Sequence, residues 1–446
     1  MLEKDYHLET MDNIKSYNVD KYKTDPERFT RNSKLVFDDY VLYAIQNEGR
    51  TTAVEANSYL NKYANDDMMT ITKQAVSFQR SFIEPMVYQD MMSDTLIRMK
   101  EDGAYPEGFK DLLVMGVDGS DLDVPPNMIT INEFNVPKDT LVYNQPAQTL
   151  CSIVSDLYNN YIWDIELADA NDDERSVFLE QLNTLDQKID LSETLLIFDR
   201  GYASIELFLE CLSKGTYFIF RLKSNVYTKE RNKMLSDDEY VNLNLNASRT
   251  KNIRNPIIQE QIKTMTHLRL RIVNIPITLK NGKTIIETLI TNLPPEKANP
   301  YELKELYHKR WDVERNYDKM KNILEIENYS GYRKRIIKQD TYAQAFLLNF
   351  LHSVKHDYEK EIPEEKKTSK NGKLSYQINV NTLAGFMTDE MPKLLSDDPQ
   401  TRKNTIKKLE KLATTNLAPS KTKKVEYPRN KNGRKYKYKL HKRRAK

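Results

Sequence analysis

The sequence predicts an α/β core with helical segments before and after it. Short apolar runs that end in an acid, LLVMGVD and LLIFD, alternate with segments of helical spacing between residues 111 and 222. Before them, apolar positions recur at helical spacing over roughly 34–47, 52–64 and 71–98. After them, the β-like runs LRLRIVNIPITL and TIIETLITNL flank an Asn-Gly turn signal, which predicts a β-hairpin.

The N-terminal helices form a small domain in this interpretation, and TITKQAVSFQRSF resembles a helix-turn-helix reading segment. Thr70 or Thr72 is the expected N-cap. The polar side chains that would contact DNA are Lys73, Gln74, Ser77 and Arg80. Helical segments with exposed polar residues are common, so a structural role stays open beside the DNA-reading one.

The core is expected to begin with the strand DLLVMGV and to continue through the strands NMITINEF and TLCSIVSDLYN. The helix DDERSVFLEQLNTLDQ, the strand LLIFDRGY, a helix closed by Gly215 and the strand TYFIFRLK follow. Residues 223 to about 296 then form a β-rich insertion before the chain returns to the core. The region 340–418 is expected to be helical.

Charge is distributed unevenly along the 446 residues, which carry a net charge of +3. Residues 420–446 contain 13 Lys or Arg and one Glu, so residues 1–419 carry 55 basic and 64 acidic residues. The tail also contains three tyrosines, a composition suited to phosphate contacts and base stacking, although a solvated, disordered end has the same composition. The absence of a long apolar run predicts a soluble cytosolic protein without a membrane partner.

Asp118 and Asp199 each follow an apolar run that reads as a strand. Ligands of open α/β sheets gather at the carboxyl ends of strands, so both acids are placed where chemistry usually occurs. An aspartate after a strand also often caps a turn, and this alternative stays open for either residue taken alone.

A third acid lies in the segment YHKRWDVERNYDKMK. Tyr307, Arg310, Glu314 and Lys321 fall within an arc of about 60° on an α-helix, because each residue adds about 100°. Arg310 and Glu314 at i,i+4 could equally form an ordinary surface ion pair. An adjacent apolar stripe would bury the helix, and it consists of Leu303, Leu306, Val313, Tyr317, Met320 and Leu324.

Three such acids favour a site for Mg²⁺ or Mn²⁺, because carboxylates are the hard oxygen ligands that these ions prefer. Asp118, Asp199 and Glu314 are the predicted ligands of two ions, a pair that serves phosphodiester hydrolysis or strand transfer. Arg310 can bind a phosphate through two N–H groups, and Lys321 supplies a point charge. The predicted substrate is therefore nucleic acid.

These residues resemble a known family. VDGS around Asp118, DRGY from Asp199, and the Y-x2-R-x3-E-x6-K series are similar to the motifs of bacterial insertion-sequence DDE transposases of the type with the YREK signature, insertion sequence family four. The resemblance covers about residues 30–360. It implies a ribonuclease H-like catalytic core with a β-strand insertion, a helical N-terminal DNA-binding domain and a helical C-terminal region. The predicted N-terminal DNA-binding domain spans residues 1–105, and the catalytic core spans 106–222 and 298–360 around the insertion at 223–297. The helical C-terminal region spans 361–419, and the basic tail spans 420–446.

The resemblance also implies cut-and-paste transposition by a homodimer that holds the terminal inverted repeats of its element and joins them to target DNA. Asp118, Asp199 and Glu314 would be the catalytic metal ligands, while Tyr307, Arg310, Lys321 and Trp311 would bind DNA. The protein would lie in the bacterial cytoplasm, associated with the nucleoid. Two alternatives remain, a catalytically silent transposase-derived DNA-binding protein and a metal-dependent nuclease without strand transfer.

Overall fold

The computed structural model describes residues 5–30, 33–63, 69–106, 108–142, 146–278, 282, 284–369, 372 and 374–421. The chain divides into two compact units. Unit 1 contains Met1–Gly103, Leu122–Thr149 and Asp318–Lys446, and unit 2 contains Ala104–Asp121 and Leu150–Tyr317. Almost all of the predicted basic tail lies outside the described residues. Within these ranges, no helix has the length and apolar character needed to cross a membrane.

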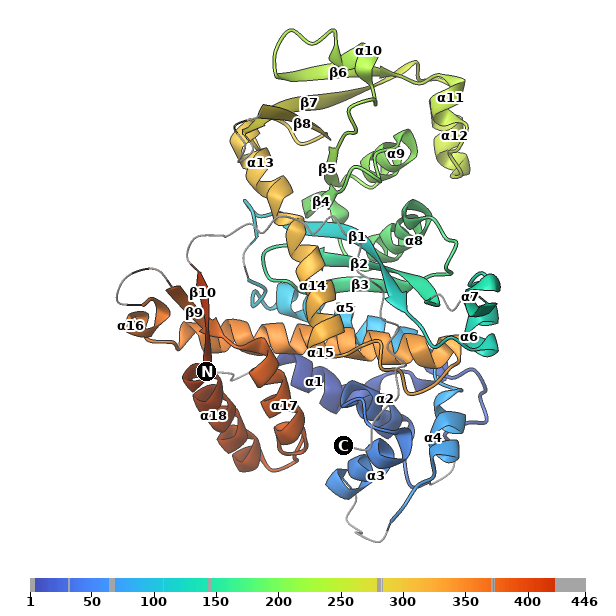
Figure 1. Ribbon diagram of the computed structural model, residues 1–446, viewed down its shortest axis with the longest axis vertical. Coiled ribbons are helices and arrows are strands. Elements are labelled where there is room, and N and C mark those ends of the chain that lie inside the picture. Colours follow the sequence, from blue (N-terminus) through green and yellow to red (C-terminus); the bar gives the residue numbers. More distant parts are fainter. Residues whose placement is uncertain are drawn as a thin grey trace. The chain divides into compact units, whose positions relative to one another are not determined.

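Unit 2 is built around a mixed sheet of eight strands in the order β3-β2-β1-β4-β5-β8-β7-β6 (Figure 1). The strands are β1 (Leu113–Asp123), β2 (Gln148–Asp156), β3 (Ile162–Leu167), β4 (Thr194–Phe198), β5 (Tyr217–Arg221), β6 (Asp238–Asn244), β7 (His267–Thr278) and β8 (Thr284–Thr291). β4 pairs in parallel with β1 on one side and with β5 on the other. The α/β core predicted from the alternating runs is therefore present.

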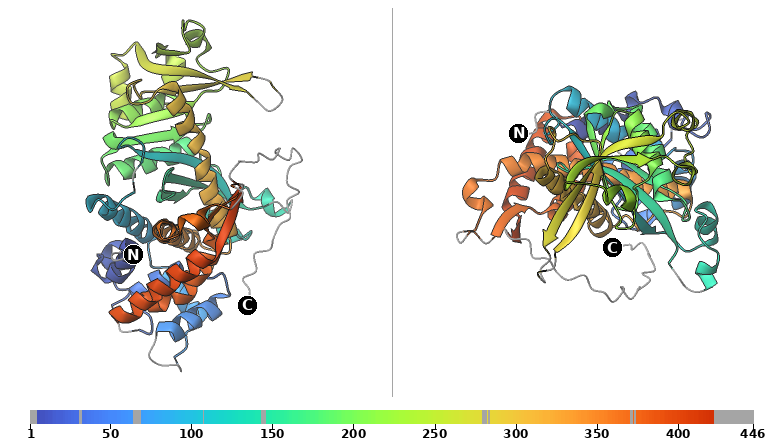
Figure 2. Two further views of the ribbon diagram at one scale, coloured as in Figure 1. Left: turned by 90° about the vertical axis from the view of Figure 1, so that its left-hand side faces the viewer. Right: turned by 90° about the horizontal axis from the view of Figure 1, so that it is seen from above.

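The strands predicted as an insertion extend this same sheet. β8 pairs antiparallel with β5, and β7 and β6 follow in antiparallel order. The predicted hairpin is confirmed, since β7 and β8 pair from Arg271↔Thr291 to Thr278↔Thr284, and Figure 2 shows them as a long two-stranded ribbon. Asn281 and Lys283 of the predicted turn lie outside the described residues, while Gly282 has φ +79°, which glycine adopts readily.

The remaining elements of unit 2 are α8 (Glu174–Asp186), η3 (Leu191–Glu193), α9 (Ile205–Ser213), α10 (Thr228–Arg231), α11 (Ala247–Thr250), α12 (Pro256–Ile262), α13 (Pro300–Lys309) and most of α14 (Trp311–Asn322). Ser204 caps α9 by accepting the N–H of Leu207. The core beside β4 is aromatic: the rings of Phe198 and Phe220 stack with centroids 4.2 Å apart. The thiols of Cys151 and Cys211 are both buried.

Unit 1 is mainly helical. Its N-terminal part holds α1 (Tyr6–Asp12), η1 (Asn13–Ser16), η2 (Val19–Tyr22), α2 (Phe37–Ile45), α3 (Thr52–Tyr63), α4 (Lys73–Arg80), α5 (Met86–Glu101), α6 (Met128–Glu133) and α7 (Asp139–Val142). Its C-terminal part holds α15 (Lys334–Lys360), α16 (Glu364–Lys367), β9 (Leu374–Ile378), α17 (Val380–Leu394), α18 (Pro399–Thr415) and β10 (Leu417–Lys421). The 27-residue α15 packs against α2 and α5 and is buried along most of its length (Figure 1).

Two local predictions in unit 1 are wrong. NMITINEF is the helix α6 and not a strand, because the Asn127 side chain accepts the N–H groups of Ile129 and Thr130 and so starts a helix. The C-terminal region is not wholly helical, since β9 and β10 pair antiparallel. Capping and long-range pairing outweigh the local pattern in both segments.

The predicted DNA-reading helix is α4, and the Thr72 side chain caps it as expected by accepting the N–H of Ala75. Arg80, however, is only 1% exposed. Its guanidinium pairs with Asp340 at 2.8 Å and donates to Gln339 at 3.0 Å. Arg80 is therefore a structural residue of unit 1 and not a DNA contact, whereas Lys73, Gln74 and Ser77 are exposed.

Candidate active site

The register of the two central strands brings two of the predicted acids together. β1 and β4 are parallel, and their pairing ends at Val117↔Phe198. Asp118 and Asp199 are the next residues along these two strands, so they lie side by side just after the paired residues. β1 itself continues to Asp123, so Asp118 lies within a strand and not beyond its end. Both acids thus lie where the β1-β4 pairing ends.

The helix α14, which carries Glu314, approaches β1 closely at a glycine. A Cβ atom on Gly116 would lie 2.5 Å from Cγ2 of Val313 and 2.6 Å from Cδ2 of Leu157. No real Cβ atom has such contacts, so the missing side chain at residue 116 allows the helix to pack directly on the strand. The Tyr317 hydroxyl lies 2.9 Å from the Asp118 carbonyl, which gives a second connection between α14 and β1.

The segment predicted as one helix is divided at Arg310 into α13 and α14. The N–H of Arg310 donates to the Tyr307 carbonyl, and the N–H of Val313 donates to the Arg310 carbonyl, both at 3.1 Å. These three-residue spacings tighten the backbone locally, as in a 3₁₀ turn. Arg310 keeps helical dihedral angles, with φ −48° and ψ −34°, so the two helices remain in sequence. The predicted apolar stripe is buried except for Leu324.

Arg310 lies between two of the acids. Its guanidinium is 3.6 Å from Asp118 and 3.4 Å from Glu314, measured between nitrogen and carboxylate oxygen. The Arg310 side chain is 4% exposed, whereas that of Glu314 is 45% exposed. The predicted ion pair with Glu314 is present, but it is not an ordinary surface pair, because Arg310 is buried and also contacts Asp118 on β1.

The electrostatics around Asp118 are dominated by burial and by other acids. Burial raises the pKa of Asp118 to about 7, although the charge of Arg310 lowers it. The carboxylates of Glu314, Glu174 and Asp199 raise the pKa further. Negative charge thus exceeds the positive charge that Arg310 supplies, and the ionised form of Asp118 needs further compensation.

Tyr307 lies beside the other strand acid. Its hydroxyl donates to Oδ1 of Asp199 at 3.2 Å, and the side chain is almost fully buried. Burial and the charge of Asp199 raise the pKa of Tyr307, which keeps the phenol protonated as a donor. Trp311 differs in being 41% exposed, with the Arg310 guanidinium 4.8 Å from its ring centroid.

Lys321 completes the predicted set, but it belongs to unit 1, which resumes at Asp318. Its ammonium lies 3.9 Å from the carboxylate of Glu327, and its side chain is 28% exposed. The structure therefore brings together Asp118, Asp199, Glu314, Tyr307, Arg310 and Trp311 within unit 2. A DNA contact by Lys321 stays a prediction.

Glu174 is a fourth acid that the sequence motifs did not reveal. It begins α8, and a Cβ atom on Gly119 would lie 2.8 Å from its carboxylate carbon, so Glu174 packs directly over β1 next to Asp118. Burial, followed by the charge of Glu174, raises the pKa of the Tyr202 hydroxyl. The DDE spacing gives no signal for Glu174, but its position at the start of a helix that follows the β2-β3 pair does place it near the sheet.

The carboxylates around Asp118 are the type of ligand that a hard divalent cation prefers. Three further carboxylates and one buried guanidinium act on Asp118, and carboxylate oxygens are the ligands that Mg²⁺ and Mn²⁺ prefer. In the part of the chain that the structure describes, no three Asp, Glu, His or Cys side chains are grouped closely enough to hold a metal ion as they stand. The Arg310 guanidinium lies between the carboxylates of Asp118 and Glu314.

Two acids thus follow the paired residues of neighbouring strands in a mixed α/β sheet, and a third lies on the helix packed against β1, an arrangement compatible with the class of metal-dependent phosphoryl-transfer proteins. Comparison with protein families narrows this class. Residues 142–350 match the family model described as the transposase DDE domain, which supports a DDE transposase. The match includes Asp199 and Glu314 and begins after Asp118, which the strand register adds to the set.

Solved structures add a weaker likeness. The chain is similar to one described as the cryo-EM structure of a piggyBac transposase synaptic complex with hairpin DNA. The TM-score is 0.44 with 10% sequence identity, and the match covers 92% of this chain and 86% of that chain. A likeness at this score does not bear on the function of the chain. Curated protein sequences gave no match.

Proposed function

We propose that the chain is a DNA transposase that cleaves phosphodiester bonds at the ends of an insertion sequence and joins the 3′-hydroxyls to target DNA. The observation that carries the proposal is the β1-β4 register, which sets Asp118 beside Asp199. The packing of α14 on Gly116, and Arg310 between Asp118 and Glu314, add the third acid to the same unit. The family match over residues 142–350 supports the transposase class.

Asp118, Asp199 and Glu314 would hold Mg²⁺ or Mn²⁺, as two ions in this proposal. Bound there, the metal would supply activation of a water or 3′-hydroxyl and stabilisation of the leaving oxygen. Arg310 provides fixed positive charge to the acids and, as a guanidinium, can also bind a phosphate oxygen. Tyr307 orients Asp199 through its hydroxyl. Trp311 presents an exposed aromatic ring on which a DNA base could stack.

The finer assignment extends the same proposal. The chain would belong to the insertion-sequence transposases with the YREK signature and have a ribonuclease H-like core. It would act by cut-and-paste as a homodimer on the terminal inverted repeats of its element, in the bacterial cytoplasm. Lys321 would contact DNA near the cleaved end, and the basic tail that begins at residue 420 would bind nucleic acid without sequence specificity.

The test uses the full chain, Mg²⁺ and DNA that carries the ends flanking its own gene. Glu314→Gln is compared with Glu305→Gln, which removes the same charge from an exposed position on the neighbouring helix α13. Cleavage and joining are followed on gels, and DNA binding is measured on the same samples. We expect both products with the wild type and with Glu305→Gln, and neither with Glu314→Gln although DNA binding is retained.

Two results would lead to other functions. Binding by the wild type without cleavage, with correct ends supplied, would indicate a silent DNA-binding protein and make the acids structural. Cleavage without joining, even when a pre-cut 3′-hydroxyl end and a target plasmid are supplied, would indicate a nuclease.

A further inference from the structure

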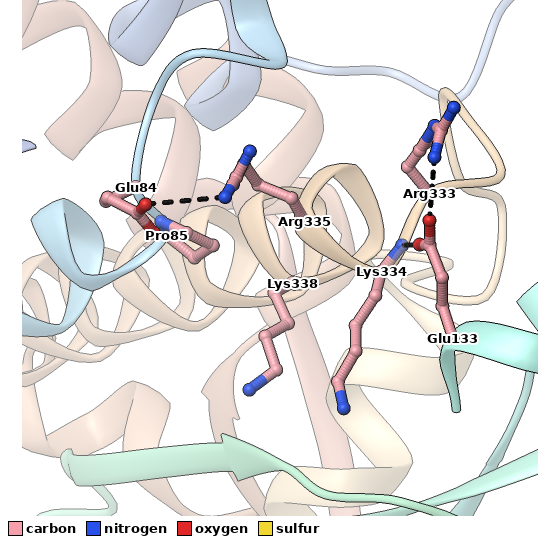
Figure 3. Close-up of a pocket in the computed structure, with 7 residues that line it drawn as sticks. All are labelled: Glu84, Pro85, Glu133, Arg333, Lys334, Arg335 and Lys338. Carbon is pink, nitrogen blue, oxygen red and sulfur yellow. Dashed lines mark hydrogen bonds and ion pairs between the residues drawn. The ribbon is translucent and has the colours of Figure 1, made fainter. Parts of the chain in front are cut away.

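A basic pocket lies within unit 1, whereas the three acids belong to unit 2. Its volume is about 400 Å³, and it is lined by Glu84, Pro85, Glu133, Arg333, Lys334, Arg335 and Lys338 (Figure 3). Four of these seven residues are cations and two are anions. This excess of positive charge stands out because residues 1–419 as a whole are acidic. A basic patch on an acidic surface concentrates attraction for anions at one place.

One side of the pocket already shows how an anion is bound. The Glu133 carboxylate accepts the backbone N–H of Lys334 at 2.6 Å and an Arg333 N–H at 3.0 Å. Lys334 is the first residue of α15, where backbone N–H groups lack partners within the helix. Glu133 therefore takes the position of an anion at the helix start, and it fixes Arg333 at the rim of the pocket.

The opposite side of the pocket is held by Arg335. Its guanidinium donates to the Ser81 carbonyl at 2.8 Å and to the Glu84 carboxylate at a longer 3.5 Å. These bonds use two of the five N–H donors of an arginine. The Arg335 side chain is 42% exposed, so this guanidinium is oriented by protein contacts and still accessible to a ligand.

Lys334 and Lys338 lie four residues apart on α15, on one face of the helix. Figure 3 shows their side chains extending in the same direction. Two ammonium groups in this arrangement can contact successive points along a polyanion. None of the lining residues is aromatic, so the pocket offers charge and N–H donors without a stacking surface for bases.

We propose that this pocket binds the phosphate backbone of duplex DNA, independent of sequence, through Arg335, Lys338 and Lys334. Small ligands are usually enclosed over most of their surface, whereas the Arg333 and Arg335 side chains here are 67% and 42% exposed. An open cationic surface without stacking groups fits a continuous backbone, whose contacts fix position and carry no sequence information. The inference rests on the proposed function in taking DNA as the polyanion.

The test measures how the affinity of the full-length protein for a duplex of arbitrary sequence depends on salt. Arg335→Gln/Lys338→Gln is compared with the wild type and with Lys403→Gln/Lys407→Gln, which removes two exposed cations from α18 in the same unit. Each lost phosphate contact lowers the slope of log K against log salt by about 0.9. We expect the pocket variant to lose about 2 from the slope over about 50–200 mM salt, and the control to match the wild type.

If the double variant folds poorly, Lys338→Gln alone is measured in its place. Its slope of log K against log salt should fall by about half as much. An unchanged slope in a folded pocket variant would overturn the inference. If such a variant still cleaves element ends, the proposed function stands, whereas a wild type that binds no duplex at all would overturn both. Titration with inorganic phosphate at constant ionic strength tests whether the pocket is instead a site for free phosphate. Phosphate binding that is lost in the pocket variant, together with an unchanged salt slope for DNA, would also overturn the inference.

Discussion

Replacing Gly116 by alanine tests how the third acid is brought to the sheet. A methyl group at this position would lie 2.5 Å from Val313 and 2.6 Å from Leu157, and both of these side chains are buried. Carbon atoms in contact are normally about 3.5–4.0 Å apart, so relief of the overlap requires movements of about 1 Å. Val313 belongs to the same helical turn as Glu314, so the movement displaces the acid.

The expected cost has two parts. Overpacking of a filled core lowers the free energy of unfolding by about 1–3 kcal/mol, which corresponds to about 2–12 °C in Tm for a domain of 150–250 residues. A displacement of about 1 Å in a catalytic constellation costs about 100-fold in rate. We therefore expect Gly116→Ala to lose far more cleavage activity than its modest loss of stability explains.

Thermal unfolding and cleavage of element ends by the same preparation provide the measurement. Gly385→Ala is the matched control, because this glycine lies inside α17 and a Cβ atom there would meet nothing within 4 Å. Alanine is the better helix former, so the control should gain about 0.5–1 kcal/mol. Gly116→Ala/Val313→Ala removes one of the overlapping methyl groups and should recover part of the activity. Wild-type Tm and activity in Gly116→Ala would refute the argument that α14 rests on this glycine.

Two other predictions concern buried charges. Arg310→Ala leaves two carboxylates facing one another without the guanidinium, so we expect a loss of about 1–3 kcal/mol in unfolding free energy without metal, and a larger rise in Tm on adding Mg²⁺ than the wild type shows. Equal Mg²⁺ responses would contradict this. Burial raises the pKa of Asp5 to about 7, so its stabilising contribution is complete below its unfolded pKa near 4 and is lost as pH rises through 7. Asp5→Asn keeps the N-cap acceptor, and its Tm relative to wild type should therefore rise between pH 4 and pH 8; a constant difference would show that Asp5 is not buried as a neutral acid.

Local patterns predicted much of unit 2. Apolar runs of four to six residues, each followed by a polar residue, predicted β1, β4 and β5, and the Asn-Gly signal predicted the β7-β8 pairing. Such patterns work where a strand is buried on both faces, because nearly every residue in it must then be apolar. They fail at NMITINEF, where the single side chain of Asn127 starts a helix in a segment of β-like composition.

The sequence did not predict which residues distant in the chain contact one another. The motif spacing selected Asp118, Asp199 and Glu314, but it did not show that Gly116 admits α14 or that Glu174 lies over Gly119. Arg80 shows the opposite error, since a polar residue on a predicted surface helix is buried against Asp340. Periodicity states which residues share a helix face, but it does not state which distant segment covers that face.

Arg310 illustrates why this difference matters for chemistry. Taken as an exposed i,i+4 pair with Glu314, it would contribute a few tenths of a kcal/mol and could be replaced with little effect. In the structure the guanidinium is 4% exposed and also reaches Asp118, whose pKa is raised by burial and by three further acids. A fixed positive charge in that position offsets part of the repulsion between the two acids in the absence of a metal ion. A divalent cation would supply positive charge to the same carboxylates, and for this reason the Mg²⁺ response of Arg310→Ala reports on the site itself and not on general stability.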